Sequence, residues 1–171
     1  MSIQSDRLQF RPFTMDDVDN LLRLWNEPGV RRYLWDDETV PREHVISMIE
    51  TSLSCFEIDG IGLWALLPIA EETLIGFCGF WHFHEPPQLE LVYGLATDYW
   101  NKGLATEAAT AMISYGFNEL KFERIEASTD AANEASVRVM KRTGMSFWKR
   151  ELTNGLDTIY YAIYSPALAS K

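Results

Sequence analysis

The residues best placed to do chemistry lie where a predicted strand, residues 88–96, leads through a short loop into a predicted helix. Small residues open that helix in the run Gly103-Leu104-Ala105-Thr106, and Lys102 adds a cation just before it. Small side chains let a ligand approach the backbone, and the free N–H groups at the positive end of a helix favour an anion. The pattern indicates an anion site, although a tight connection without any ligand has the same appearance.

The same predicted strand carries a single carboxylate, Glu90, among apolar residues. The alternation of a strand places Glu90 on the face shared by Val92 and Gly94. A carboxyl group buried there has a raised pKa unless it is paired, and it can then take up a proton through water. Glu90 is therefore a candidate general base, with a solvated residue or an ion-pair partner as the alternative.

A second candidate stretch opens the helix expected over residues 133–143. Asn133 is a favoured N-cap residue, and Gly144 is typical of the end of a helix. Both structural roles are expected, and neither excludes a ligand contact from the side-chain amide of Asn133. Ser136 lies in the first turn of this helix, where a hydroxyl needs no functional explanation.

Two histidines lie at the end of the predicted strand 73–83. His82 and His84 alternate around Phe83, so both side chains are expected on one face. They could act as a base or line an acceptor site, and exposed or hydrogen-bonded structural histidines are the alternative. Because no other ligand lies nearby in sequence, we do not expect a metal site.

Two aromatic stretches suit a substrate site less specifically. Trp35 and Asp36 begin an acidic loop, Trp35-Asp36-Asp37-Glu38, between two predicted helices. Three carboxylates beside a tryptophan suit a cation, but a solvated loop is the simpler interpretation. Tyr161 belongs to a tyrosine-rich strand whose side chains either pack in the core or face a substrate.

Hydrophobic periodicity predicts the elements that must position these residues. Strands are expected over residues 7–13, 61–69, 73–83, 88–96, 124–129, 145–152 and 157–164. Helices are expected after the N-cap residue Thr14 and before Pro28, from Pro41 through Phe56, and over residues 103–120 and 133–143. The dipeptide Asn154-Gly155 predicts a tight hairpin between the last two strands.

The order of these elements is β-α-α-β-β-β-α-β-α-β-β. Strands that cluster in the middle and at the end of a chain disfavour a purely parallel, doubly wound sheet. The predicted fold class is therefore α/β, with a mixed sheet and helices on both faces. At 171 residues, without a linker or an internal repeat, the chain is expected to form a single domain over residues 1–171.

The composition narrows the classes of partner. With 47% hydrophobic residues the chain is globular, and no apolar run approaches the roughly 18 residues that cross a bilayer. The 25 acidic and 15 basic residues leave a net charge of −10, which disfavours nucleic acid. That charge favours a cationic substrate such as an amine or a basic peptide, although it also simply aids solubility. Residues 1–7 carry no export signal, and Cys55 and Cys78 lack metal-binding spacing, so we expect a cytoplasmic protein with reduced thiols.

Taken together, these motifs resemble the GNAT acetyltransferases, and among them the RimJ/RimL-like branch that acetylates N-terminal amines of ribosomal proteins. Residues 90–108 are similar to that branch's Glu-x-x-Tyr strand followed by Tyr-Trp-x-Lys-Gly-x-Ala-Thr-Glu-Ala. Residues 124–145 are similar to its Arg-Ile-Glu-Ala strand, its Asn-x-x-Ser helix start and its closing glycine. Each motif is common by itself, but the combination is specific and the resemblance covers nearly the whole chain.

The resemblance implies a mixed, mostly antiparallel sheet of about seven strands that splays open near its middle and holds acetyl-CoA there. It implies that the pyrophosphate meets backbone N–H groups in the loop 101–106, and that the pantetheine runs along the end of the strand 88–96. The cofactor-binding residues expected are Leu95, Ala96, Asn101, Lys102, Gly103, Leu104, Ala105, Thr106 and Asn133. The acceptor-binding residues expected are Trp35, Asp36, His84 and Tyr161.

Two positions depart from the general pattern of the family. Many members have Gln or Arg at the position of Trp100, whereas the RimJ/RimL-like branch has Trp there, as this chain does. Backbone N–H groups can carry the contact with the pyrophosphate without that side-chain charge. Met140 stands where many members have a Tyr that protonates the departing thiol. A thiol with a pKa of about 8.5 leaves readily, so a weaker donor suffices. Ser136 is the candidate donor, and Glu90 is the candidate base for the amine; a structural role for Ser136 is the alternative.

Three functions stay open at this point. The first is transfer of the acetyl group of acetyl-CoA to an N-terminal α-amine, or another amine, of a protein or peptide by direct attack in a ternary complex. The second is the same chemistry on a small amine, such as an amino acid, a polyamine or an aminoglycoside. The third is a non-catalytic CoA-binding domain, which the missing Tyr supports. Either a monomer or a homodimer is expected, with no membrane or nucleic-acid partner.

Overall fold

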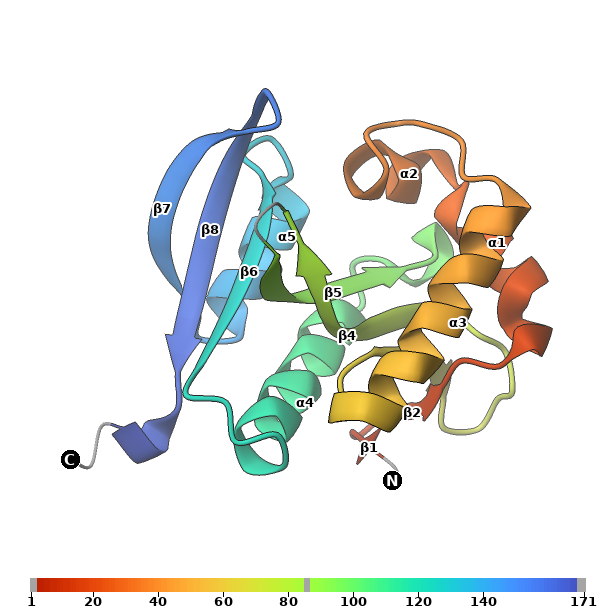
Figure 1. The fold of residues 1–171 in the computed structure, drawn as a ribbon, viewed down its shortest axis with the longest axis horizontal. Helices are drawn as coiled ribbons and strands as arrows, with labels where there is room; N and C mark the ends of the chain where they lie inside the picture. The colour runs from red at the N-terminus through yellow and green to blue at the C-terminus, as the bar shows by residue number, and fades with distance from the viewer. Residues whose placement is uncertain (1–2, 85–86, 169–171) are drawn as a thin grey trace.

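A computed structural model describes residues 3–84 and 87–168, in which eight strands form one open sheet with helices on both faces (Figure 1). The strands are β1 (Ile3–Gln4), β2 (Leu8–Pro12), β3 (Leu63–Pro68), β4 (Gly76–Phe83), β5 (Gln88–Leu95), β6 (Arg124–Asp130), β7 (Ser146–Thr153) and β8 (Leu156–Tyr164). The α-helices are α1 (Val18–Trp25), α2 (Pro28–Leu34), α3 (Arg42–Asp59), α4 (Leu104–Asn118) and α5 (Glu134–Arg142). The mixed α/β class is confirmed, and the strand beyond the expected seven is the two-residue β1.

The sheet is antiparallel everywhere except at its middle. Its strand order is β1-β2-β3-β4-β5-β6-β8-β7, and β5 and β6 are the parallel neighbours. These two strands pair where Glu90 meets Glu126, and beyond that point they diverge (Figure 1). The divergence leaves part of the β5 edge without a neighbouring strand, which opens the sheet to a ligand as the resemblance implied.

Two hydrophobic clusters hold the helices against the two faces. On one face, fully buried Ala108, Ala109 and Met112 let α4 approach the sheet closely. On the other face, Leu21 of α1 and Ile49 of α3 pack with apolar residues of β3 and β4. Among the described residues, no helix combines the length and hydropathy needed to cross a bilayer.

Local sequence signals explain where several elements begin and end. Thr14 and Asp17 form the capping box of a short turn of 3₁₀ helix before α1, and Asp17 is buried against the Arg11 guanidinium. Pro28 ends the expected first helix but also starts the seven-residue α2, an element that the sequence interpretation missed. Proline is tolerated at the first helical position because the N–H that it lacks has no partner there. The strand expected from residue 73 begins only at Gly76, after a longer loop.

Candidate active site

A cavity of about 540 Å³ opens where β5 and β6 diverge. Its walls come from α2, β5, the start of α4, β6, the start of α5 and the β7–β8 turn. The volume lies in the range of roughly 300–1,000 Å³ that is common for small-molecule sites. Glu90, Gly103 and Ser136 all line this cavity, so the three candidate motifs of the sequence meet in one place.

The start of α4 presents backbone donors to this cavity. Gly103 is the N-cap residue with φ of +76°, and no side chain caps the helix. The intrahelical hydrogen bonds begin with the N–H of Glu107, which donates to the carbonyl of Gly103 over 3.0 Å. The N–H groups of Leu104, Ala105 and Thr106 therefore lack partners within the helix and suit an anion.

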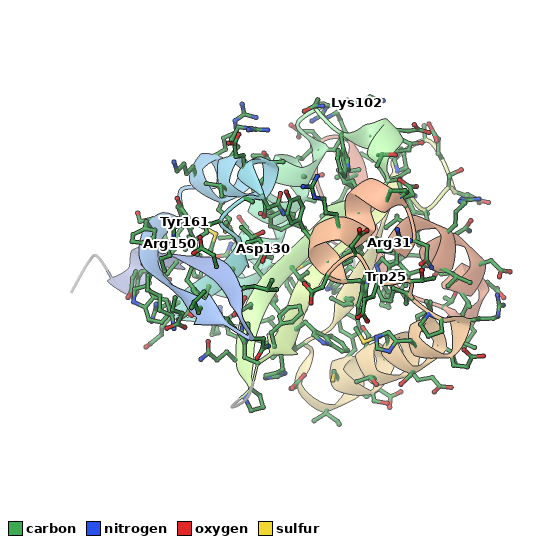
Figure 2. The ribbon with its side chains drawn as sticks, turned by 90° about the horizontal axis from the view of Figure 1, so that it is seen from above. Trp25, Arg31, Lys102, Asp130, Arg150 and Tyr161 are labelled. Atoms are coloured by element: carbon green, nitrogen blue, oxygen red, sulfur yellow. The ribbon has the colours of Figure 1, made fainter. Side chains whose placement is uncertain are left out.

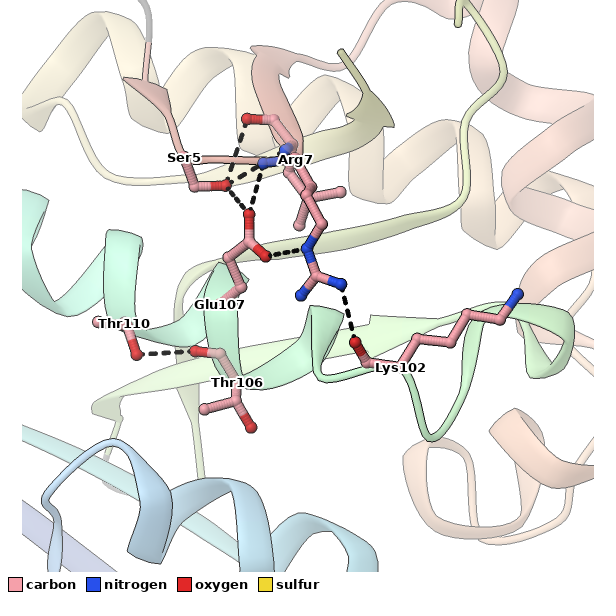
Figure 3. A network of polar contacts seen from close by, with 7 residues as sticks. Ser5, Arg7, Lys102, Thr106, Glu107 and Thr110 are labelled. Atoms are coloured by element: carbon pink, nitrogen blue, oxygen red, sulfur yellow. Dashed lines mark hydrogen bonds and ion pairs between the residues drawn. The ribbon is translucent and has the colours of Figure 1, made fainter. Parts of the chain in front are cut away.

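Side chains from the N-terminal strand region brace this loop from outside the cavity (Figure 3). The Arg7 guanidinium donates to the Glu107 carboxylate over 2.7 Å and to the Lys102 carbonyl over 2.9 Å. Ser5 and the backbone N–H of Arg7 also donate to Glu107 over 2.7 Å each. Burial raises the pKa of Glu107, but these hydrogen bonds outweigh it and hold the pKa below its usual value. The brace fixes the loop that carries the free N–H groups.

Trp100 and α2 pack together at the rim of the same loop. The Trp100 indole donates to the Leu95 carbonyl over 2.8 Å, and Glu27 accepts from the N–H of Thr97 over 2.7 Å. An added Cβ at Gly29 would lie 2.8 Å from Cη2 of Trp100, so only glycine permits this approach. Trp100 thus has a positioning role, and it also lines the cavity.

Glu90 is buried but not isolated. It is 2% exposed, and its carboxylate lies 2.8 Å from Nε2 of His84 and accepts from the Ser128 hydroxyl over 2.5 Å. His84 has φ of +69°, a conformation rare for residues other than glycine and often found at functional sites. The structure therefore joins two residues that the sequence interpretation considered separately, and it adds Ser128, which that interpretation missed.

Ser136 is held by Tyr93, whose side chain leaves β5 on the face opposite to that of Glu90. The Tyr93 hydroxyl lies 2.9 Å from Oγ of Ser136 and donates to the Ser136 carbonyl over 3.2 Å. Burial raises the pKa of Tyr93, and the hydrogen bond with Ser136 offsets only part of this effect. The phenol therefore stays protonated near neutral pH. Sequence reasoning missed Tyr93 as a site residue, although it stands in the Glu-x-x-Tyr motif.

Asn133 caps α5 as expected. Its side-chain Oδ1 accepts from the N–H of Ser136 over 3.3 Å, and its Nδ2 donates to the Thr129 hydroxyl over 3.0 Å. A primary amide carries two N–H donors, so one N–H of Nδ2 remains for a ligand. Asn133 lines the cavity, which is compatible with both its structural and its predicted binding role.

The structure separates the other predicted site residues into two groups. Those that line the main cavity are Asp36, His84, Leu95, Asn101, Leu104, Ala105 and Thr106. Those absent from its lining are Trp35, Ala96, Lys102 and Tyr161. Lys102 projects from the edge of the molecule with its ammonium 5.1 Å from the Tyr99 ring centroid (Figure 2). Tyr161 is buried, and its ring meets the exposed Phe147 ring edge to face over 6.0 Å, whereas the adjacent Tyr160 ring lies 6.0 Å from the His84 ring.

Carboxylates gather at one end of the main cavity. Asp36 and Asp130 both line it, and Asp130 lies on the β6 side of the opening (Figure 2). Burial raises the pKa of Asp130, and the nearby carboxylates of Asp36 and Asp157 raise it further. Such a group of acids attracts a cation, as the net charge of the chain suggested.

Neither cysteine offers a nucleophile to the main cavity. Cys78 is fully buried in β4, where burial raises the pKa of its thiol despite a hydrogen bond from the Gly79 backbone. Cys55 lies in α3, and neither residue lines the main cavity. The described residues contain no cluster of three or more His, Cys, Asp or Glu side chains that could hold a metal ion.

Comparison with protein families identifies the family of this chain. Residues 7–146 match the family model described as the acetyltransferase (GNAT) domain. The chain belongs to the GNAT acetyltransferase family. It is therefore an N-acetyltransferase that uses acetyl-CoA, and the free N–H groups at the start of α4 are suited to the phosphates of that molecule.

Individual relatives agree with this assignment. An uncharacterized N-acetyltransferase, p20 of Bacillus licheniformis, is 28% identical over 88% of this chain and 84% of its own length. A spermidine N(1)-acetyltransferase of Escherichia coli K12 is 25% identical over 81% of this chain and 73% of its own length.

Solved structures share the fold over almost the full length. A GNAT-family acetyltransferase from Bacillus anthracis is 26% identical, has a TM-score of 0.80 and covers 96% of this chain and 98% of its own. RimL, a ribosomal L7/L12 α-N-protein acetyltransferase in complex with CoA, is 17% identical and has a TM-score of 0.81. The match covers 98% of this chain and 99% of the RimL chain. At that identity, the likeness to RimL concerns the fold alone.

Proposed function

We propose that this GNAT enzyme transfers an acetyl group to the N-terminal α-amine, or another amine, of a protein or peptide by direct attack in a ternary complex. One observation carries the proposal: a single cavity joins the uncapped start of α4, the buried Glu90–His84 pair and the Tyr93–Ser136 pair. The cavity thus holds an anion site, a proton acceptor and a proton donor. The alternative of a non-catalytic domain has no comparable support.

Glu90 and His84 form the proton-accepting unit of the proposed mechanism. Only a neutral amine attacks, and α-amines have a pKa of about 7.7–8.0 whereas the lysine amine has a pKa of about 10.4. Nε2 of His84 faces the Glu90 carboxylate, and Nδ1 has no hydrogen-bond partner among the described residues. The carboxylate can hold the ring in one tautomer and stabilise the charge that the ring gains with a proton.

Tyr93 and Ser136 form the proton-donating unit. Acetyl-CoA supplies an activated acetyl group, and its transfer to an amine releases a thiolate. The Tyr93 phenol has one hydrogen; when it donates this to Oγ of Ser136 instead of to the Ser136 carbonyl, the Ser136 hydroxyl can direct its own hydrogen toward the cavity. Met140, at the position of the usual Tyr, is 1% exposed and packs in the core instead.

The class of acceptor is supported by likeness and by charge. The resemblance of residues 90–108 and 124–145 to the RimJ/RimL-like motifs favours an N-terminal α-amine, and an α-amine also needs less help with its proton than a lysine does. The carboxylates of Asp36 and Asp130 favour a second candidate, a small polycationic amine of the kind named in the spermidine relative. We further propose a single domain over residues 1–171, present as a monomer or homodimer in the cytoplasm, where the free thiols of Cys55 and Cys78 remain reduced.

Acetyl-CoA is expected to stabilise the protein, and suitable amines are expected to release free CoA. Ligand at about 100 times its dissociation constant should add roughly 2.7 kcal/mol to the free energy of unfolding. The measurement is thermal unfolding with and without acetyl-CoA, followed by a free-thiol assay with peptides, amino-acid amides, polyamines and aminoglycosides. Peptides with free N-termini should release CoA faster than the same peptides with blocked N-termini. Release of CoA with spermidine but with no peptide would move the assignment to small amines.

Loss of either member of the Tyr93–Ser136 pair should slow turnover. Tyr93→Phe and Ser136→Ala each remove one hydroxyl, and we expect both to lower kcat by up to about 10²-fold because the thiolate is a fair leaving group. The double variant should be no slower than the slower single variant, since the two hydroxyls act as one unit. An acetyl donor with a more acidic thiol should reduce the loss. A Ser136→Ala enzyme that loses only CoA affinity would make Ser136 a binding residue.

A further inference from the structure

A second cavity, of about 260 Å³, adjoins the main cavity. Four residues line both cavities: Leu34, Phe77, Phe83 and Val92. Val92 lies two residues from Glu90 on the same strand, so its side chain lies on the same face as the candidate base. One molecule could therefore fill the second cavity while its amine lies in the first.

The walls of this second cavity are mostly aromatic. The rings of Trp25 and Trp35 are 5.0 Å apart, and Trp25 meets Phe77 edge to face at 84° over 5.9 Å. Trp35 meets the His44 ring at 90° over 5.0 Å. Trp81 also contributes, and among the residues that the structure describes no Asp, Glu, Lys or Arg side chain lines this cavity.

Two hydrogen-bond donors in these walls are unsatisfied. The indole nitrogens of Trp25 and Trp35 are shielded from solvent, and neither has a hydrogen-bond partner among the described residues. Trp25 is 1% exposed as a whole residue. An indole N–H can only donate, and a buried donor without an acceptor destabilises the fold. Both residues line the cavity, so an occupant that offers an acceptor oxygen to either indole would satisfy a donor that the described residues leave unpaired.

We propose that this cavity binds a neutral aromatic side chain of the acceptor, one that carries a hydrogen-bond-accepting oxygen such as a phenol. The proposal rests on the amine acetyltransferase function proposed above. A dry cavity of about 150 Å³ is known to hold benzene, so a cavity of about 260 Å³ has room for a substituted ring. A ring also gains edge-to-face contacts with the aromatic walls.

Charge and hydrogen bonding distinguish a neutral aromatic occupant from a cation, an aliphatic side chain or water. A cation would gain from the aromatic faces, but its burial requires a counter-charge that the lining residues do not provide. An aliphatic side chain would fill the space and leave both indole N–H groups unpaired. Water could satisfy the donors, and it is the occupant that the experiment must distinguish from a ring.

The first test compares three amines that differ only in side chain: tyrosinamide, phenylalaninamide and glycinamide. Burial of the ring should raise kcat/KM for phenylalaninamide roughly tenfold or more above glycinamide. The phenol oxygen should raise kcat/KM for tyrosinamide a further several-fold, because it satisfies a buried donor. Trp35→Phe keeps a ring but removes one N–H, so the tyrosinamide-to-phenylalaninamide ratio should fall toward one. Trp148→Phe, at an exposed tryptophan on β7, is the matched control and should keep the ratio.

The second test measures binding without turnover. Titration with p-cresol, a phenol that has no amine, should shift the indole N–H resonances of Trp25 and Trp35 and leave that of Trp148 in place. Unshifted Trp25 and Trp35 signals at millimolar p-cresol, or equal kcat/KM for the three amides, would overturn the inference and leave water as the occupant. Shifts by p-cresol with no acetylation of any amine would instead support the aromatic site and overturn the proposed function.

Discussion

Glu90→Gln is expected to lower kcat by about 10²–10⁴-fold, the usual contribution of a general base. The substitution keeps the shape of the side chain, and the amide can still hydrogen-bond with Ser128 and His84. It removes the negative charge that stabilises a proton on the His84 ring. Free amine accumulates as the pH rises toward the amine pKa, so the rate of the variant should recover at high pH more steeply than that of the wild-type enzyme. The measurement is a pH–rate profile for both enzymes with one amine.

Glu126→Gln provides the matched control for this experiment. Glu126 is the residue that pairs with Glu90 across the parallel strands, but it does not line the active-site cavity. Burial raises the pKa of Glu126, and the nearby Glu90 carboxylate adds to this effect, although Arg124 opposes it. The control therefore also removes a half-buried carboxylate from the same pair of strands. We expect Glu126→Gln to keep kcat within a few-fold of the wild-type enzyme. A Glu90→Gln enzyme with a wild-type pH–rate profile would return Glu90 to a structural role.

The partner of Glu90 adds a second arm to the same experiment. If Glu90 acts through His84, then His84→Asn should reproduce most of the loss, and the double variant should lose little more than either single variant. Additive losses would mean that the two residues act on different steps. This comparison separates a relay through the imidazole from direct proton uptake by the carboxylate.

The contacts of Glu90 show what a sequence can predict about a site. The sequence showed that a carboxylate stands in an apolar strand, and this alone made Glu90 a candidate. The sequence did not show its pairing, because the turn at His84 has a positive φ and carries the ring back toward β5. Ser128 comes from β6, 38 residues away, and a hydrogen bond at that separation depends on the sheet order.

The alternation of side chains along β8 explains why Tyr160, rather than the expected Tyr161, lies toward His84. The periodicity of β8 placed its tyrosines on alternating faces but did not say which face would meet the active site. Both tyrosines are buried in the structure, and it is Tyr160 that lies toward His84, with its hydroxyl 2.8 Å from that of Thr153. The neighbouring strand β7 has an irregular register between Phe147 and Lys149, which no local pattern predicts.

The elements themselves followed the local sequence more closely. Apolar periodicity and capping residues predicted α1, α3, α4, α5 and most strands to within a few residues, because those signals act over one or two turns. Among the helices the exception was α2, because Pro28 has two opposite meanings in a sequence: it stops a preceding helix and starts a following one. That ambiguity matters for function, since Val30 and Tyr33 of α2 line the main cavity and Leu34 lines both cavities.

Gly103→Val is expected to weaken the binding of CoA strongly while the protein still folds. Gly103 has φ of +76°, which a β-branched residue adopts only with strain, on the order of 1–2 kcal/mol. Gly103 also lines the cavity and directly precedes Leu104 and Ala105, whose N–H groups are free, so valine adds bulk at the edge of this site. A hydrogen bond to a charged group contributes about 1.5–3 kcal/mol, so each blocked contact should raise the dissociation constant of CoA roughly tenfold or more. Calorimetric titration with CoA measures this directly.

Gly155→Val separates this effect from backbone strain. Gly155 has φ of +80° in the β7–β8 turn, no atom lies within 4 Å of an added Cβ, and the residue does not line the cavity. The two valine variants should therefore lose similar stability in thermal unfolding, but only Gly103→Val should lose CoA affinity. An added Cβ at Gly103 meets no atom closer than the Arg7 guanidinium at 3.5 Å, so overlap with the protein does not explain a loss of binding. If both variants bind CoA like the wild-type enzyme, the phosphates lie elsewhere, and the free N–H groups of α4 need another explanation.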